Sequence, residues 1–249
     1  MRFFFIIPVL LFATSFMQEE RKMKIFIAGD STMSIKDVKA YPETGWGMPF
    51  VHFWDSSVIV VNRAKNGRST KTFISEGLWK SVVDEATEGD MVLIQFGHND
   101  ESKEKTERYT TPKQFSANLT GFVTDCRNRK ALPILITPVS RRWFDSTGNA
   151  LETHREYSRL TKEVAAKMNV PLIDLDERSR ALYQQFGSEN SKLLFLHLRK
   201  GEHPNYPEGK NDNTHFNELG ARLIAQIVLE ELLKLEPGLK ERLAVPKKK

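Results

Sequence analysis

The sequence predicts an α/β protein in which a five-stranded parallel sheet lies between two layers of helices. Five short runs rich in Ile, Val and Leu recur along the 249 residues and alternate with helical patterns. The runs are nearly continuous in apolar residues, which is typical of parallel strands covered on both faces. The predicted strands are residues 24–28, 58–62, 91–96, 132–137 and 171–174.

Helices are expected between and after these strands, at residues 47–54, 78–86, 112–129, 151–168 and 216–233. The third has the most readable start, because Thr111 is a good cap residue and Pro112 suits the first helical position. Apolar side chains then recur at helical spacing, at Phe115, Leu119 and Phe122. This apolar face is predicted to pack on the sheet.

The N-terminus resembles a secretory signal peptide, which we expect to occupy residues 1–20. Arg2 precedes an apolar run at residues 3–13 that is too short to span a bilayer comfortably, and residues 18–22 are polar. A buried first strand or an N-terminal anchor is the alternative. We therefore expect one domain over residues 21–249, exported to the periplasm or the medium, with no stable membrane anchor after cleavage.

Charge and cysteine content restrict the partners and the redox chemistry. The net charge is +5, but the only dense basic block is residues 247–249, so nucleic acid is not an expected partner. A polymer of acidic sugars would also suit a basic protein. Cys126 is the only cysteine, so no intramolecular disulfide can form, and no surrounding His or Asp pattern marks it as a nucleophile.

Four short blocks in a fixed order carry the chemistry. They are residues 29–32 (Gly-Asp-Ser-Thr), Gly67, residues 97–100 (Gly-His-Asn-Asp) and residues 212–215 (Asp-Asn-Thr-His). The first three follow the first three predicted strands, and the carboxyl ends of parallel strands meet at one edge of a sheet. The fourth comes from a loop-rich segment at residues 199–213, immediately before the last predicted helix. Acyl transfer needs a nucleophile, a base, a carboxylate that orients the base, and oxyanion donors.

The blocks can supply each of these parts. Ser31 is the candidate nucleophile at a strand-to-helix turn, although a plain helix cap is the alternative. His215 is the candidate base and Asp212 its orienting carboxylate. A spacing of three at the start of the last helix would place both on one face. The alternative for this pair is a capping Asp and a first-turn His.

Three donors are predicted for the oxyanion: the backbone N–H groups of Ser31 and Gly67 and the side-chain amide of Asn99. The Asn66–Gly67 dipeptide is also a common tight turn, and the two roles are compatible. Residues 29–33 lack the second glycine of the Gly-x-Ser-x-Gly elbow.

The chain resembles the SGNH (GDSL-type) hydrolases, whose name corresponds here to Ser31, Gly67, Asn99 and His215. The resemblance runs from residue 25 to about residue 233, and residues 95–100 and 212–216 look most like the rhamnogalacturonan acetylesterase branch. It implies a flavodoxin-like fold and a secreted serine esterase that removes acetyl groups from a plant cell-wall polysaccharide. We expect no cofactor.

A sugar-binding groove is expected beside these blocks, because aromatic rings stack on sugars and arginines pair with uronate carboxylates. The candidates are His98, Trp46, Arg141, Arg142 and His203, together with Tyr41, Trp143 and Tyr206. Core packing or ordinary surface charge is the alternative for each. His197, His203, His215 and Asp212 show no defensible zinc spacing, so no metal is predicted.

Three other functions remain open from sequence. One is an acetylesterase acting on xylan or another glycan. A second is a lipase or lysophospholipase, for which the polar substrate-side loops are unfavourable. The third is a noncatalytic carbohydrate-binding protein, which would have no use for Ser31, Asp212 and His215 together.

Overall fold

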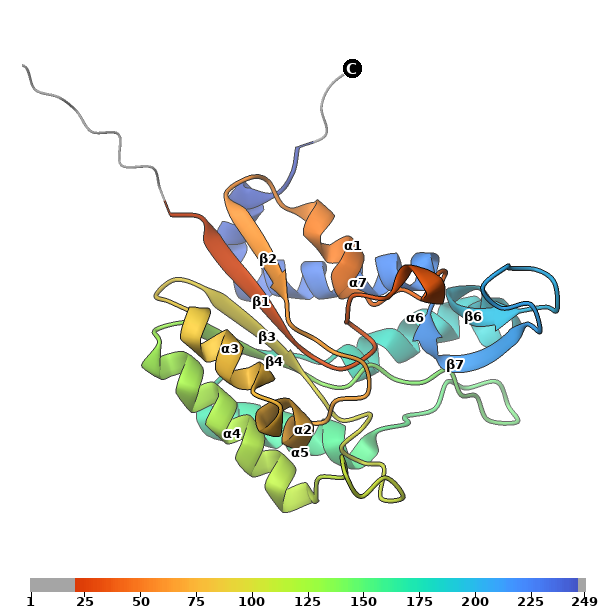
Figure 1. The fold of residues 1–249 in the computed structure, drawn as a ribbon, viewed down its shortest axis with the longest axis horizontal. Helices are drawn as coiled ribbons and strands as arrows, with labels where there is room; N and C mark the ends of the chain where they lie inside the picture. The colour runs from red at the N-terminus through yellow and green to blue at the C-terminus, as the bar shows by residue number, and fades with distance from the viewer. Residues whose placement is uncertain (1–20, 246–249) are drawn as a thin grey trace, which may run out of the picture.

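The computed structural model describes residues 21–245, which contain one five-stranded parallel sheet and one antiparallel hairpin (Figure 1). The sheet order is β2-β1-β3-β4-β5. Its strands are β1 (Met23–Gly29), β2 (Val58–Asn62), β3 (Met91–Gln95), β4 (Leu132–Ile136) and β5 (Leu172–Ile173). The predicted fold class is confirmed. The predicted signal peptide, residues 1–20, lies outside the described residues.

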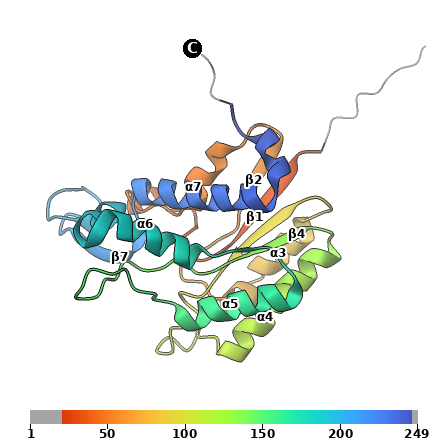
Figure 2. The ribbon, with the colours of Figure 1, turned by 180° about the vertical axis from the view of Figure 1, so that it is seen from behind.

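Helices cover both faces of the sheet (Figures 1 and 2). They are α1 (Gly47–Phe50), α2 (Thr70–Ser75), α3 (Leu78–Glu85), α4 (Pro112–Asn128), α5 (Arg155–Met168), α6 (Leu175–Asn190) and α7 (Glu218–Leu235). Helices α1, α6 and α7 pack on one face, and α2 to α5 on the other.

Successive residues of β1 enter opposite cores, which explains why its apolar run is continuous. Ile25 and Ile27 belong to the core beneath α1 and α7, whereas Phe26 and Ala28 belong to the core beneath α3 and α4. All four are fully buried. Because side chains alternate across a strand, a strand covered on both faces needs apolar residues at every position.

Local sequence explains the helix starts that were predicted. Thr111 and Gln114 form a reciprocal capping box at the start of α4, with Pro112 at the first position. Asn217 caps α7, because its side chain accepts a hydrogen bond from Gly220 N. Cys126 is buried in α4, and burial raises the pKa of its thiol to about 12.

The region before α7 differs from the expectation. Residues 212–215 do not begin a helix but lie in β7 (Lys210–Phe216), which pairs with β6 (Phe195–Leu198). Helix α7 begins only after Asn217. Helices α2 and α6 and this hairpin were also not predicted. No helix among residues 21–245 is both long and apolar enough to cross a membrane.

Asp100 ties the loop after β3 to the start of α2. Its Oδ1 accepts hydrogen bonds from Thr70 N at 2.9 Å and Thr70 Oγ1 at 2.6 Å. These two hydrogen bonds join segments that are 30 residues apart in the sequence. The carboxyl is fully buried, and burial raises its pKa to about 7.

This raised pKa predicts a pH dependence of stability. Between about pH 4 and pH 7 the unfolded chain releases the Asp100 proton while the folded protein keeps it, so this contribution to stability falls as the pH rises. Asp100→Asn cannot ionise and retains an oxygen acceptor for Thr70. The variant should therefore lose less stability than the wild type between pH 4.5 and pH 6.5, as measured by urea denaturation.

Asp84→Asn, at an exposed carboxylate on α3, is the matched control and should keep the wild-type pH dependence. Equal slopes for Asp100→Asn and the wild type would contradict the assignment.

Candidate active site

Ser31 stands in a tight turn directly after β1. Asp30 Oδ1 accepts hydrogen bonds from Thr32 N at 2.9 Å and Thr32 Oγ1 at 2.8 Å. Gln95, the last residue of β3, donates from Nε2 to Thr32 Oγ1 at 2.7 Å. A side chain at Gly29 would put its Cβ 2.5 Å from Gln95 O, so glycine permits this close approach. The turn is thus fixed to two strands, and residues 31–37 do not begin the helix that the sequence suggested after it.

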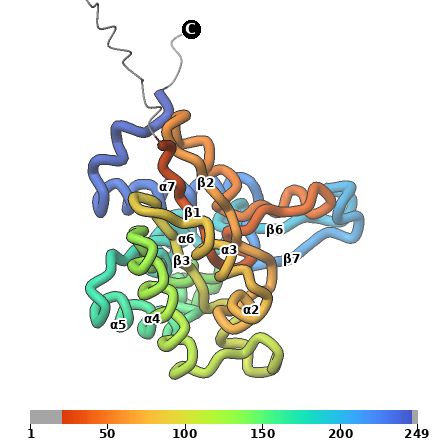
Figure 3. The backbone as a smooth tube through the Cα atoms, turned by 60° about the vertical axis from the view of Figure 1, so that its left-hand side comes forward, coloured from red at the N-terminus to blue at the C-terminus, as the bar shows by residue number. Residues whose placement is uncertain are grey.

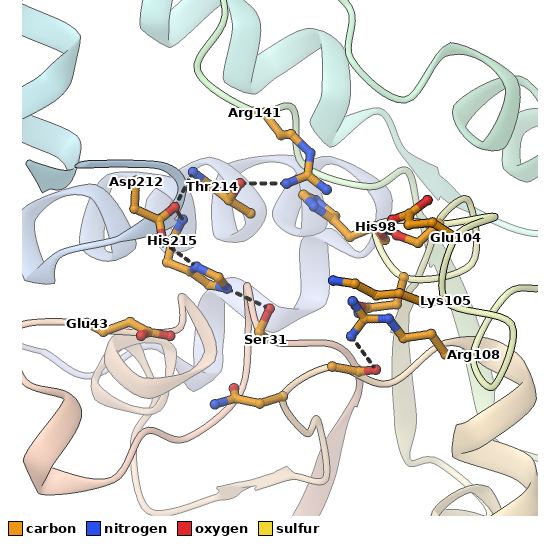
Figure 4. Close-up of a pocket in the computed structure, with 14 residues that line it drawn as sticks. Ser31, Glu43, His98, Glu104, Lys105, Arg108, Arg141, Asp212, Thr214 and His215 are labelled. Atoms are coloured by element: carbon orange, nitrogen blue, oxygen red, sulfur yellow. Dashed lines mark hydrogen bonds and ion pairs between the residues drawn. The ribbon is translucent and has the colours of Figure 1, made fainter. Parts of the chain in front are cut away.

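Ser31, His215 and Asp212 form a continuous hydrogen-bonded chain (Figure 4). His215 Nε2 lies 3.0 Å from Ser31 Oγ, and His215 Nδ1 lies 2.8 Å from Asp212 Oδ2. The other Asp212 oxygen accepts from Thr214 N at 2.7 Å and His215 N at 3.0 Å. Asp212 and His215 are therefore brought together by a turn that the Asp212 side chain closes, and not by a shared helix face as the sequence suggested.

The surroundings of Asp212 favour its ionised form. Partial burial would raise the pKa of this carboxyl, but the hydrogen bond and charge of His215 and the two backbone N–H groups outweigh burial and lower the pKa below its ordinary value. Asp212 is therefore ionised at neutral pH. A carboxylate in this position can hold one tautomer of the imidazole and stabilise the imidazolium.

Arg142 holds the β7 segment in place. Its Nη1 donates to Asn213 Oδ1 at 2.8 Å, its backbone N donates to Asn213 O at 2.8 Å, and its Nε donates to Ser191 Oγ at 3.0 Å. Its Nη2 donates to Ser188 O. The side chain is buried and its donors are used within the protein, so the prediction that Arg142 binds substrate is wrong.

Gly67 and Asn99 lie beside Ser31 in one pocket. Gly67 has a φ of +76°, in the left-handed region that favours glycine. Asn99 donates one amide hydrogen to Arg68 O at 2.9 Å, which fixes the plane of the amide and leaves its second hydrogen for another acceptor. Both groups can therefore serve as donors to an anion near Ser31.

The pocket has a volume of about 550 Å³ and a strongly polar lining. Figure 4 shows Ser31 between His215 on one side and Lys105 and Arg108 on the other, with Arg141 above. The lining residues are Ser31, Glu43, Asn66, Gly67, His98, Asn99, Ser102, Glu104, Lys105, Arg108, Arg141, Asp212, Thr214 and His215. Apart from Gly67, every one of them has a polar or charged side chain.

Two of the predicted substrate-binding residues line this pocket, His98 and Arg141. Arg141 Nη1 donates to Thr214 Oγ1 at 2.6 Å, which holds the guanidinium at the pocket wall. His98 Nε2 donates to Val139 O at 2.8 Å, and burial, followed by the charge of His154, lowers the pKa of His98 well below its usual value. His98 is therefore a neutral imidazole.

Two other predicted residues lie elsewhere. Trp46 is fully buried in the core and donates from Nε1 to Gln95 Oε1 at 3.1 Å, so the prediction that it contacts substrate is wrong. His203 is not among the pocket-lining residues. It lies in the turn between β6 and β7 with its ring centroid 5.6 Å from that of Tyr41. This turn and residues 36–44 lie side by side (Figure 3).

Sequence reasoning did not find Lys105 and Arg108. They come from the loop that follows β3, only a few residues after Asn99. Its run of charged residues is typical of ordinary solvated surface. Their place in the sequence could have indicated them. A loop that leaves the carboxyl end of a central strand must pass the sheet edge where the four blocks meet. Among residues 21–245, no three His, Cys, Asp or Glu side chains form a group that could hold a metal ion.

Comparison with protein families and curated proteins gives consistent matches. The model of the "GDSL-like Lipase/Acylhydrolase family" matches residues 27–223. Rhamnogalacturonan acetylesterase RhgT of Bacillus subtilis (strain 168) is 41% identical over 224 residues, which cover 90% of this chain and 95% of RhgT. Probable rhamnogalacturonan acetylesterase YesY of the same strain is 36% identical over 85% of this chain and 93% of its own length.

Solved structures share the fold. The crystal structure of YXIM_BACsu from Bacillus subtilis superposes with a TM-score of 0.74 and 25% identity over 86% of this chain, which spans 57% of that protein. Axe2, an acetylxylan esterase from Geobacillus stearothermophilus, gives a TM-score of 0.56 at 17% identity over 85% of this chain and 94% of Axe2. The second likeness is one of fold alone.

The hydrogen-bonded chain predicts selective modification of one serine. A fluorophosphonate should label Ser31 once per molecule, because His215 can accept the hydroxyl proton as the oxygen attacks phosphorus. Intact-mass measurement should show no label on Ser31→Ala. Labelling of His215→Ala should be slower by at least about a thousandfold.

Ser102→Ala is the matched control, since Ser102 is a second serine in the same pocket and should not be needed. A label that persists in Ser31→Ala would show that another residue is the reactive one.

Proposed function

The chain belongs to the GDSL-like lipase/acylhydrolase family, and we propose that it is a serine esterase that removes O-acetyl groups from rhamnogalacturonan, a pectin-type polysaccharide. The observation that carries the reaction type is the hydrogen-bonded chain from Asp212 through His215 to Ser31. It contains a nucleophile, a base within reach of its proton and a carboxylate that orients the base.

In the proposed acylation step, Ser31 Oγ attacks the acetyl carbonyl carbon while His215 Nε2 takes the hydroxyl proton. Asp212 stabilises the resulting imidazolium. The oxyanion receives hydrogen bonds from the N–H groups of Ser31 and Gly67 and from Asn99 Nδ2. When the intermediate collapses, the ester C–O bond breaks and the imidazolium protonates the leaving sugar oxygen.

Deacylation repeats these steps with water in place of the serine. His215 removes a proton from a water molecule that attacks the acetyl-enzyme carbonyl, and the same donors hold the second oxyanion. Collapse releases acetate and returns the proton to Ser31 Oγ. Losing one oxyanion donor in such an enzyme typically costs about a hundred- to a thousandfold in turnover.

The assignment to an acidic polysaccharide has two supports. The curated relatives RhgT and YesY are named as rhamnogalacturonan acetylesterases. In addition, Lys105, Arg108 and Arg141 place three basic side chains around the nucleophile, where they can pair with the carboxylates of neighbouring uronate residues. A lipid acyl chain would instead need an apolar channel, which this polar lining does not provide.

Acetate release from two acetylated polymers tests the proposal. The protein should deacetylate rhamnogalacturonan in preference to xylan, and Ser31→Ala and His215→Ala should lower turnover to background, by roughly 10⁶-fold. Preference for xylan would support the proposed deacetylation but contradict rhamnogalacturonan as the substrate. Preference for long-chain esters would indicate a lipase, and binding of either polymer without turnover would indicate a carbohydrate-binding protein.

The same assay tests whether the basic side chains around Ser31 recognise the polysaccharide. Lys105→Gln should raise KM for acetylated rhamnogalacturonan about two- to fivefold, because an exposed charge pair contributes on the order of 0.5–1 kcal/mol. KM for acetylated xylan, which has few charges, should change less. Lys103→Gln, at an exposed lysine of the same loop outside the pocket, is the control. An equal change for both polymers would contradict a role in recognising uronates.

We also propose that the protein is exported, because the basic start and short apolar run of residues 1–13 have the form of a signal peptide. Expression of the full chain in a bacterium with fractionation should yield a shortened protein outside the cytoplasm, with an N-terminus near residue 20 by mass spectrometry. A full-length product retained in the cytoplasm would contradict export.

A further inference from the structure

Lys36 is a buried lysine beside the catalytic groups. Its side chain is only 2% exposed. Its ammonium lies 2.5 Å from Ser31 O, 2.8 Å from Asn66 Oδ1 and 2.7 Å from Glu43 Oε1. An ammonium has three N–H donors, and here each has one acceptor. Burial lowers the pKa of Lys36, and the contact with Glu43 acts in the opposite direction.

Two of these three acceptors belong to the segments that would supply the backbone oxyanion donors. Ser31 is itself one donor residue, through its N–H, and Lys36 holds it by its carbonyl oxygen. Asn66 precedes Gly67, so the carbonyl of Asn66 and the N–H of Gly67 belong to one planar peptide group. Any group that orients Asn66 therefore also orients the Gly67 N–H.

Asn66 is held from several directions. Lys36 Nζ and Ser34 Oγ both donate to its Oδ1, at 2.8 Å and 2.5 Å. Arg68 Nη1 donates to its carbonyl oxygen at 2.8 Å. Lys36 and Ser34 come from the segment that leaves Ser31, whereas Asn66 and Arg68 come from the loop that follows β2. The Lys36–Asn66 contact therefore connects the two segments across the site.

We propose that Lys36 is a positioning residue that acts through Asn66 and Ser31 to hold the two backbone oxyanion donors, Ser31 N–H and Gly67 N–H, at a fixed separation. This inference rests on the proposed function. The ion pair with Glu43 compensates the buried charge, and the contacts with Ser31 and Asn66 perform the positioning. Any buried ammonium needs an acceptor for each of its three N–H donors, so the effect of substitutions on kcat is what distinguishes a positioning lysine from a purely structural one.

Kinetics with a small ester isolate this effect from polysaccharide binding. In Lys36→Met, a chain of similar length keeps most of the packing but cannot donate. We expect kcat for 4-nitrophenyl acetate to fall about 10- to 100-fold, since a small misplacement of a catalytic group costs up to about a hundredfold. KM should change less than threefold, because the donors act chiefly on the transition state. Rates are normalised to sites titrated with a fluorophosphonate.

Asn66→Ala should lower kcat over the same range, because it removes the acceptor that relays the position of Lys36. The double variant should lose less than the product of the two single losses, because both substitutions break the Lys36–Asn66 contact. Lys39→Met, at an exposed lysine on the same segment, is the matched control and should retain wild-type kcat. Thermal unfolding of each variant shows whether it is folded at the assay temperature.

The outcomes separate the possibilities. A kcat within twofold of the wild type in Lys36→Met, with a lower melting temperature, would show that the lysine is structural only. Multiplicative losses in the double variant would show that Lys36 and Asn66 act independently, which also overturns the proposal. If Lys36→Met does not fold, a kcat in Asn66→Ala that equals the wild-type value would likewise overturn the proposal. If the wild type hydrolyses no ester, the proposed function itself fails.

Discussion

The hydrogen bond between His215 Nε2 and Ser31 Oγ joins residues 184 positions apart in the chain, and the architecture of the site depends on keeping this contact. Ser31 is set by the sheet, because its turn is hydrogen-bonded to the end of β3 through Thr32 and Gln95. His215 lies on a hairpin outside the sheet. Its position must therefore come from contacts that bring the hairpin to the carboxyl edge of the strands.

Two segments supply those contacts. The loop after β4 holds β7 through Arg142 to Asn213, and Arg141 adds a hydrogen bond to Thr214. From the other side, Thr44 N donates to Phe216 O at 2.9 Å, which attaches residues 36–44 to the end of the same strand. Residues near the site thus divide between those that face the pocket and those that hold its walls, and Arg141 does both.

The strands and the order of the blocks could be predicted because their signals are local. A run such as residues 91–94 is apolar at every position, and topology then brings the ends of parallel strands together. The hairpin had no such signal. β7 reads Lys-Asn-Asp-Asn-Thr-His-Phe, and its pairing with β6 is set by distant contacts. Whether a side chain lies in the core or faces the substrate also depends on the tertiary structure, as Trp46 and Arg142 show. An aromatic ring or a guanidinium can be buried within the protein as well as line a binding groove.

The carboxylates near Ser31 show why the distant Asp212 suits the proposed role of orienting His215 better than the adjacent Asp30 does. Burial raises the pKa of Asp30, and the hydrogen bonds from Thr32 offset this only in part; its Oδ2 has no partner among residues 21–245. Asp212 is partly exposed and accepts from His215 Nδ1 and two backbone N–H groups, so its pKa falls. Environments that shift the pKa values of two carboxyl groups in opposite directions suit the two groups to different roles. Asp30 shapes the turn that presents Ser31, while Asp212 retains the negative charge that would stabilise a protonated His215 in the proposed mechanism.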